Sequence, residues 1–551
     1  MKRNFVIILL LFSIAECFSQ SIPQDYLVSN KINLSKSVQN ISNKVIGFQR
    51  FNVLPTPSST IISNFISDII TISNPAGDTI WFGTGKGLSR TTNRGVTFEN
   101  FYGLAPFGED DVSGIDVYKN WIVVSTAVSQ LINDEQIPTG TGIKVSSDYG
   151  VTWSAYPQPV DQRYDTTIVY GNQNIYALDI VVTQQNLSYD ILIAKKNRTS
   201  DSLIFWITSW AGELRKSIDF GATFKRVLLP PDNLDSIYPG GGPYNFRYDP
   251  NNPPVGNDNH KCFAICSEND STYFVGTANG INKSTDWGVS WRKFSYANTG
   301  SGAGVSGDFV VALKVQSYSG RKIIWAASNP ATSGGVSGLS YSTNSGANWN
   351  NTLSTTVEGF SHDIGFKDSI VFGATDEGIW RSYFSSSFSW SKPSIIYDET
   401  IRDRIYSLAF YSVDSQGDSV WVGSGDGLAR TIDTVQSPWV GKWKIFRAYR
   451  EVTSTNETYA APNPFSPKDE VVRIFFKTGK TSSDVTVRVF DFGMSPVRTV
   501  VQNANRQDPN MLWVVWDGKR NDGSQAANGI YFYRIEVDKD LTFWGKILLL
   551  Q

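Results

Sequence analysis

The chain has 551 residues, a formal net charge of -2 and only 18 % charged residues. This length exceeds one ordinary hydrophobic core, so two or more domains are predicted. The near-neutral charge and the lack of a basic run argue against nucleic-acid binding. With 46 Gly, 17 Trp and 13 % aromatic residues, the composition favours short strands joined by glycine-rich turns over helices.

Residues 1–20 have the layout of an export signal. Lys2 and Arg3 form a short basic region, and the apolar run Phe5–Ile14 is too short to span a bilayer. Cys17 would suit a lipoprotein, but the glutamate before it stands where a small residue is needed, which disfavours lipidation. No later apolar run reaches about 18 residues, so no transmembrane segment is expected in the mature chain.

Seven copies of one pattern fill residues 60–448. Each copy is a short apolar strand that ends in small residues and, in its fullest form, leads into Gly-aliphatic-x-basic. The strands are IWFGT (80–84), IVVST (122–126), IFWITS (204–209), YFVGT (273–277), IIWAAS (323–328), IVFGA (370–374) and VWVGS (420–424). Each copy offers about four short strands, the number in one propeller blade. The repeats therefore predict a seven-bladed β-propeller over residues 60–448, with a two-sheet stack as the alternative.

A second phrase, S-x-D-x-G-x-T-W, follows most of these strands. Its acidic or amide position is occupied by Asn93, Asp148, Asp219, Asp286 and Asn344. An Asp or Asn oxygen can accept hydrogen bonds from backbone N–H groups a few residues on, and the glycine supplies a positive φ. Because the copies look alike, we interpret them as structural turns rather than catalytic sites.

The turn phrase resembles the Asp-box, or BNR repeat, of sialidases, sortilin-type receptors and related propellers. The strand phrase WFGTGKGLSR also resembles the two-component-regulator type of propeller repeat in secreted bacterial proteins. In the families with an Asp-box, the turn lies away from the active site, which agrees with a structural role.

The resemblance to sialidases makes a hydrolase the alternative function. Those enzymes begin their arginine cluster in an aromatic-Arg-Ile-Pro phrase, and FQRFNVLP (48–55) matches it poorly. Other arginines fall at the repeated strand ends, which indicates structural or surface roles: Arg90, Arg215, Arg381 and Arg430.

Propeller glucanases, the second enzymatic comparison, use two carboxylates across a cleft and generally need two propellers. Asp116, Asp308 and Asp363 are conceivable inner-strand carboxylates, but nothing in the sequence pairs them. We therefore predict no catalytic residues and no enzymatic activity, and keep a sialidase-like or glucanase-like hydrolase as the alternative.

One segment, 238–260, interrupts the repeat with a Pro-, Gly- and Asn-rich stretch. Loops of some 20 residues inside a compact domain are uncommon and often functional. The predicted ligand-binding residues are Tyr244, Phe246, Arg247, Tyr248 and Asp249. A stacking surface of this kind suits a sugar or a peptide, and an insertion without a ligand is the alternative. No cofactor or metal is predicted, although Asp249 and Asp258 leave calcium open. A second insertion, 129–141, leaves the same two interpretations open: a functional loop or an insertion without a ligand.

Cys262 and Cys266 fall on the same face of an expected strand, about 13 Å apart. A disulfide needs Cα atoms within about 7 Å, so these two cysteines are not expected to form one. Metal binding is a weaker interpretation than buried thiols, because the chain has only two histidines, His260 and His362.

After a linker at 449–459, the composition changes and the repeat stops. Residues 460–551 alternate in short strands, with WDG at 516–518 marking a turn, and predict an immunoglobulin-like sandwich. PNPF, WDGxxxxG and ANGIYFYRIE resemble the FlgD-type Ig-like domain and the C-terminal sorting domain of the type IX secretion system. That resemblance implies export across the outer membrane of a Gram-negative bacterium, and often anchoring at its surface.

Taken together, the sequence predicts an exported cell-surface or extracellular binding or scaffold protein. Its propeller would bind a glycan or a protein partner, and its C-terminal domain would serve secretion through type IX-like machinery and anchoring. Residues 21–59 leave two interpretations open. They either close the propeller by donating a strand to the last blade through IGFQRFNVL, or act as a linker.

Overall fold

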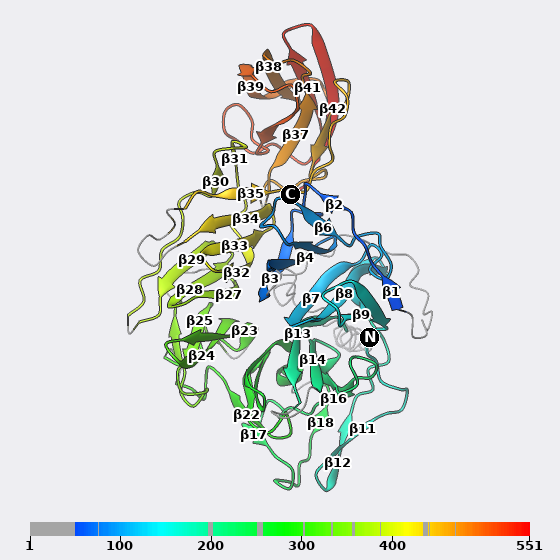
Figure 1. Cartoon of the computed structure of the whole chain (residues 1–551), viewed down its shortest axis with the longest axis vertical. Coiled ribbons are helices and arrows are strands. Elements are labelled where there is room, and N and C mark those ends of the chain that lie inside the picture. The colour runs from blue at the N-terminus through cyan, green and yellow to red at the C-terminus, as the bar shows by residue number, and fades with distance from the viewer. Residues whose placement is uncertain are drawn as a thin grey trace, which may run out of the picture. The chain divides into compact units, whose positions relative to one another are not determined.

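A computed structural model of the chain describes residues 50–74, 77–196, 202–250, 257–300, 303–331, 334–354, 359–385, 387–433, 439, 441–468 and 470–551 (Figure 1). The export signal, Cys17 and most of the 21–59 segment lie outside the described residues. The fold is all-β: no α-helix occurs within these ranges, and one 3-10 turn covers Asp258–His260. No helix in the described ranges has the length and apolar character that crossing a membrane requires.

The described strands of the repeats form up-and-down antiparallel meanders, one for each repeat. The second meander contains β7 (Asp111–Tyr118), β8 (Trp121–Ile132), β9 (Glu135–Ser146) and β10 (Thr152–Tyr156), to which β1 (Arg50–Asn52) is added. The third contains β13 (Ser188–Lys195), β14 (Leu203–Ser209), β15 (Glu213–Ser217) and β16 (Lys225–Arg226), and the fourth contains β17 (Ser236–Ile237), β19 (Cys262–Asn269), β20 (Thr272–Thr277), β21 (Gly280–Ser284) and β22 (Trp291–Phe294). The fifth contains β23 (Phe309–Tyr318), β24 (Arg321–Asn329), β25 (Gly338–Ser342) and β26 (Asn350–Thr352). The remaining repeat strands are β2 (Pro57–Ser58), β3 (Ile66–Asn74), β4 (Gly77–Thr84), β5 (Gly87–Thr91) and β6 (Phe98–Asn100); β27 (Ser361–Lys367), β28 (Ile370–Thr375) and β29 (Gly378–Tyr383); and β32 (Phe410–Gln416), β33 (Ser419–Ser424), β34 (Gly427–Ile432) and β35 (Lys444–Phe446).

The chain divides into two compact units, which we describe separately. The first unit comprises the described residues up to Leu54, with those of Gly85–Leu88 and Phe101–Ile364. The second comprises Pro55–Thr84, Ser89–Asn100 and Gly365–Gln551, so it joins the first and last repeats to the C-terminal region.

Within each unit, the first strands of successive meanders lie side by side, as in a propeller: β7 against β13, β13 against β19 and β19 against β23 in the first unit, and β3 against β32 in the second. An aspartate in the strand fastens the neighbours. The Asp116 carboxylate accepts one hydrogen bond from the N–H of Val117, the next residue in the same strand (2.8 Å). It accepts another from the Ile193 N–H of the next meander (2.6 Å). Asp414 repeats this arrangement toward the Thr71 N–H (2.8 Å). The exact number of blades stays a prediction.

The two repeated phrases of the sequence meet between neighbouring meanders. Lys216 Nζ donates to the backbone oxygen of Trp287, at the turn phrase of the next repeat (3.2 Å), and packs over the Trp206 ring. The glycine of that same turn, Gly288, has a positive φ of 79°, and a Cβ there would lie 2.4 Å from Trp206. The basic residue and the turn glycine are therefore two sides of one inter-repeat contact.

The two described N-terminal strands pair with early repeats. β1 pairs with β10 in the second meander, and β2 pairs with β6 in the first. The interpretation that this segment adds a strand to the last blade is therefore wrong for residues 50–58. β10 and β6 are the outermost strands of their meanders, and the short N-terminal strands β1 and β2 pair with their outer edges.

The C-terminal region is a two-sheet sandwich. One sheet contains β36 (Tyr459–Ala461), β37 (Val472–Lys477) and β40 (Met511–Trp516), and the other contains β38 (Ser483–Phe490), β39 (Pro496–Arg506), β41 (Gly529–Val537) and β42 (Leu541–Leu549). Side chains from both sheets form one apolar core, which includes Ile474, Val487 and Ile535. The expected linker folds back on itself, because the Tyr459 hydroxyl donates to the Arg450 carbonyl (2.6 Å).

Candidate functional site

Three groups of residues bear on function: the repeated turns, the loop segment 238–260, and a buried ionic cluster beside the C-terminal domain. In the turn at Asp148, its carboxylate accepts from the Thr152 N–H (2.8 Å) and from the Ser146 hydroxyl (2.9 Å). Partial burial would raise the pKa of Asp148, but these hydrogen bonds and the charge of Arg50 lower it. The carboxylate oxygens therefore accept hydrogen bonds mainly from groups within their own turn.

The other turns repeat this geometry. In each, the Asp or Asn oxygen accepts from the N–H four residues on, at 2.8–2.9 Å: Asn93 from Thr97, Asp219 from Thr223, Asp286 from Ser290 and Asn344 from Asn348. The local shape of these turns accounts for the sequence phrase without a ligand.

The predicted loop residues do not all reach the surface. Tyr248 is fully buried and donates its hydroxyl to the Val227 carbonyl (2.8 Å), and Asp249 is 4 % exposed. Tyr244 and Phe246 pack against the apolar core of this region. Only Arg247 projects into solvent, with its side chain 49 % exposed and Nε 3.3 Å from the Asp249 carboxylate.

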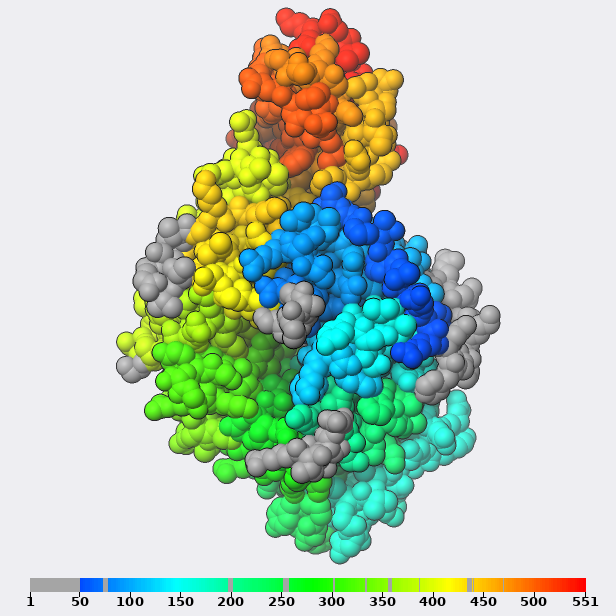
Figure 2. Space-filling model, in the orientation of Figure 1, coloured from blue at the N-terminus to red at the C-terminus, as the bar shows by residue number. Residues whose placement is uncertain are grey.

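This loop is completed by a second insertion that the sequence reasoning missed. β11 (Thr167–Tyr170) and β12 (Gln173–Ala177) form a hairpin, and β18 (Arg247–Tyr248) from the loop pairs in parallel with β12. We call this three-stranded sheet the accessory sheet (Figures 1 and 2, with the hairpin in cyan). A signal was available, because TIVYGNQNIYA alternates and turns at Gly171-Asn172.

The two faces of the accessory sheet differ in chemistry. Tyr170, Ile175 and Tyr248 point into the core. On the opposite face, Tyr176 is 71 % exposed and Val169 is 76 % exposed. Thr167 and Arg247 are the register partners of Tyr176 on the two neighbouring strands, so an exposed tyrosine and an exposed arginine occupy adjacent positions on one face.

The conceivable catalytic carboxylates serve structural contacts. Asp116 fastens two meanders as described above, and Asp308 accepts from the Tyr296 N–H (2.6 Å). Asp363 is paired with Lys314 Nζ at 2.9 Å. None of these contacts sets two of the three carboxylates against one another.

The strand-end arginines are also engaged in contacts within the fold. Arg90 pairs with Glu99, Arg215 with Asp161 and Arg381 with Asp433, and Arg430 donates to the Arg94 carbonyl. Arg215 differs in register from the others, because Ser209 pairs with Glu213 where other repeats pair with a glycine. Lys216 thus takes the repeated basic position.

The two cysteines are buried free thiols, and burial raises the pKa of Cys262 above its usual range. Asp258 pairs with Lys261 (2.7 Å), as Asp249 does with Arg247. Across the described residues, no group of three or more His, Cys, Asp or Glu side chains is placed to hold a metal ion.

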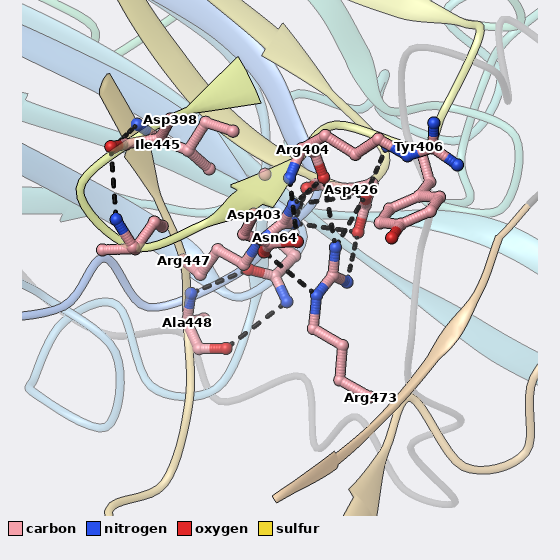
Figure 3. A network of polar contacts seen from close by, with 12 residues as sticks. Asn64, Asp398, Asp403, Arg404, Tyr406, Asp426, Ile445, Arg447, Ala448 and Arg473 are labelled. Carbon is pink, nitrogen blue, oxygen red and sulfur yellow. Dashed lines mark hydrogen bonds and ion pairs between the residues drawn. The ribbon is translucent and has the colours of Figure 1, made fainter. Parts of the chain in front are cut away.

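The third group is a buried ionic cluster of two arginines and two aspartates, shown in Figure 3. Asp403 lies in the short hairpin of β30 (Tyr397–Asp398) and β31 (Asp403–Arg404), Asp426 lies in the turn before β34, and Arg447 follows β35. Arg473 comes from β37 of the C-terminal domain. All four side chains are at most 6 % exposed.

The contacts within this cluster are dense. Arg447 reaches Asp403 at 2.7 Å and Asp426 at 2.9 Å. Arg473 binds both oxygens of Asp426, at 2.7 and 3.1 Å, and lies 3.3 Å from Asp403. Burial would raise the pKa of Asp426, but the charges of Arg447 and Arg473 hold it below its usual value. The sum of two positive and two negative charges is zero, which makes their burial tolerable.

No protein-family model and no curated protein sequence matches this chain. Three solved structures illustrate its structural similarities. PorZ of Porphyromonas gingivalis, an essential bacterial surface component of the type-IX secretion system, is 13 % identical with a TM-score of 0.39, over 88 % of this chain and 66 % of that one. The GH74 enzyme of Niastella koreensis is 13 % identical with a TM-score of 0.47, over 92 % and 74 %. The extracellular domain of the putative one-component system BT4673 from B. thetaiotaomicron is 11 % identical with a TM-score of 0.31, over 91 % and 75 %.

This chain thus spans just under two thirds of the length of PorZ.

Proposed function

We propose that this chain is an exported protein of the bacterial surface or extracellular space that binds a glycan or protein partner through the accessory sheet. The observation that carries the proposal is the exposed face around Tyr176, whose ring is 71 % exposed and flanked in register by Arg247. Two insertions far apart in sequence build this one face, while its reverse side is fixed in the core.

The chemistry of the face suits a ligand with a ring and polar substituents. An exposed tyrosine offers a flat apolar surface with a hydroxyl at its end, and a guanidinium can stack or donate in a fixed geometry. The Asp249 carboxylate pairs with Arg247 Nε at 3.3 Å. Neighbouring Asn174 and Thr167, both exposed, supply further hydrogen-bonding groups.

The C-terminal domain would serve secretion and anchoring, as its resemblance to sorting domains implies. Its outer face offers a surface for that task. Trp544 is 46 % exposed, and Arg534 packs over both the Trp544 and Phe490 rings at 5.6 and 5.5 Å. Phe492, 75 % exposed, extends this aromatic strip. Export through type IX-like machinery is the route we propose.

A screen of the full mature chain on a glycan array tests the binding proposal, with the same array assayed for sugar release. Tyr176→Ala should abolish at least about 90 % of the signal, because truncating an aromatic residue at the centre of a binding site costs about 2 kcal/mol or more, roughly a thirtyfold loss of affinity. Tyr318→Ala, at a tyrosine 36 % exposed at the end of β23, is the matched control and should bind normally.

The possible results separate the candidate functions. Binding that survives Tyr176→Ala would overturn the accessory sheet as the site. Release of sugar would favour the hydrolase alternative instead. If no glycan binds, a pull-down that compares the same two variants assigns the face to a protein partner when only Tyr176→Ala loses the captured protein.

A further inference from the structure

The ionic cluster joins the C-terminal domain to the last repeat of the propeller. Arg473, in β37, supplies one of its two positive charges and is 2 % exposed. Without it, the carboxylates of Asp403 and Asp426 would share Arg447 alone, which leaves a net negative charge at a buried position. Removing one member of a buried ion pair is strongly destabilising, because it leaves an uncompensated buried charge.

The same cluster is continuous with the contact between the last and first repeats. Asn64, just before β3, accepts a hydrogen bond from the Ala448 N–H (2.7 Å) and donates to the Ala448 carbonyl (3.3 Å). The Gly427 N–H donates to the Asn64 carbonyl (2.7 Å). Gly427 directly follows Asp426, and Ala448 directly follows Arg447. The first repeat is therefore hydrogen-bonded to the residues that directly follow Asp426 and Arg447, two of the four members of the ionic cluster.

The described strands provide no shared sheet at this junction. β32 to β35 all come from the last repeat, and the N-terminal strands β1 and β2 pair elsewhere. Individual contacts hold the first and last repeats together instead, such as Asp414 toward the Thr71 N–H, the packing of Phe82 against Trp421 and the Gly427 to Asn64 hydrogen bond. The Gly427 and Ala448 backbones supply further contacts at this junction, both with Asn64.

From these contacts we infer that the C-terminal domain has a second function, as a clamp that holds the first and last repeats of the propeller together. Arg473 holds Asp426 in place. Asp426 and Arg447 in turn hold the backbone just before β34 and just after β35. Asn64 of the first repeat is hydrogen-bonded to that backbone, so its position depends on the cluster. Figure 3 shows this chain of contacts from Arg473 to Asn64. Loss of the C-terminal domain would loosen the propeller as well as remove a sorting domain.

Hydrogen–deuterium exchange of the full mature chain tests this inference. Arg473→Met removes the charge while keeping an apolar stem. Arg488→Met is the matched control, because Arg488 lies in the same domain and pairs with Glu536 at 2.8 Å, but its side chain is 29 % exposed. We expect Arg473→Met to speed exchange in peptides that contain Thr71, Gly427 and Ala448 by about tenfold or more, and Arg488→Met to leave them unchanged.

The distribution of the exchange decides the outcome. Faster exchange restricted to β36–β42 would show that Arg473 stabilises only its own domain and would overturn the clamp. If Arg473→Met does not accumulate as folded protein, Arg473→Lys keeps one charge without the two-pronged contact and should give an intermediate acceleration at the same three amides. Unchanged exchange at those amides in Arg473→Lys would also overturn it.

Discussion

Arg473 Nη1 lies 2.7 Å from Asp426 Oδ1, and the two residues belong to different domains. Both side chains are almost completely buried, so this contact is protected from solvent and from added salt. It makes the C-terminal domain part of the structural support of the last repeat, and it sets the first prediction.

Asp426→Asn should destabilise the chain by about 3–5 kcal/mol, because Arg447 and Arg473 would then share Asp403 alone. The pKa of Asp426 is lowered, so its contribution is present at neutral pH and is lost as the pH falls through the usual aspartate range of about 4 and below. Urea unfolding between pH 3 and 7 measures both effects. The solvent-exposed Asp540→Asn is the control, and equal stability of the two variants would contradict the prediction.

Glu213→Gly should stabilise the protein at neutral pH by about 2 kcal/mol. Glu213 is fully buried with a positive φ of 62°, and neither carboxylate oxygen has a hydrogen-bond partner among the residues that the structure describes. Strain at such a φ and an unsatisfied buried group each cost about 1–3 kcal/mol, offset in part by the space that the side chain vacates.

The pH dependence of the same position provides a separate check. Burial raises the pKa of Glu213 well above its usual value, so the folded state binds the proton more tightly than the unfolded state. Stability contributed by this group is complete below the unfolded pKa of about 4.3 and declines as the pH rises toward the folded pKa. Glu213→Gln should flatten that decline in thermal melts above pH 5. An unchanged slope would show that the carboxyl is solvated.

Lys144→Met should stabilise the chain by about 2 kcal/mol at pH 7. Lys144 is 4 % exposed, and burial lowers its pKa to about 8, partly offset by Asp110 at 3.9 Å. Because the unfolded state holds the proton more tightly, wild-type stability should rise as the pH increases from about 8 to 10.5. Denaturant midpoints over this range measure the rise, which the variant should lack. Exposed Lys225→Met is the control, and destabilisation by Lys144→Met would mean that its contacts with Thr126 and Asp110 outweigh the cost of burial.

Gly288→Ala should cost about 3 kcal/mol, of which about 1 kcal/mol is the positive φ and the rest the clash with Trp206. Gly240→Ala separates the two effects, because Gly240 also has a positive φ, of 82°, but has nothing within 4 Å of the new Cβ. Tryptophan fluorescence during urea unfolding reports both. Equal losses in the two variants would show that the packing of the turn on Trp206 adds nothing to stability.

Much of the local structure was predictable from sequence because it is encoded over short distances. The strand IWFGT and the turn around Asp148 follow from alternation, glycine placement and local hydrogen bonding, which depend on residues within a few positions. The same locality explains why the buried thiols of Cys262 and Cys266 could be expected, since both lie on one face of a strand. The hairpin of the accessory sheet carried a similar signal that the search for repeats passed over.

What the sequence by itself determined was therefore the all-β repeat and its turns. The tertiary structure decided which distant residues meet. Nothing local indicates that Arg473 is buried against Asp403, 70 positions away, or that Tyr248 faces the core while Arg247 faces solvent. Charge burial depends on the complete set of partners around a group, and that set exists only after the chain has folded.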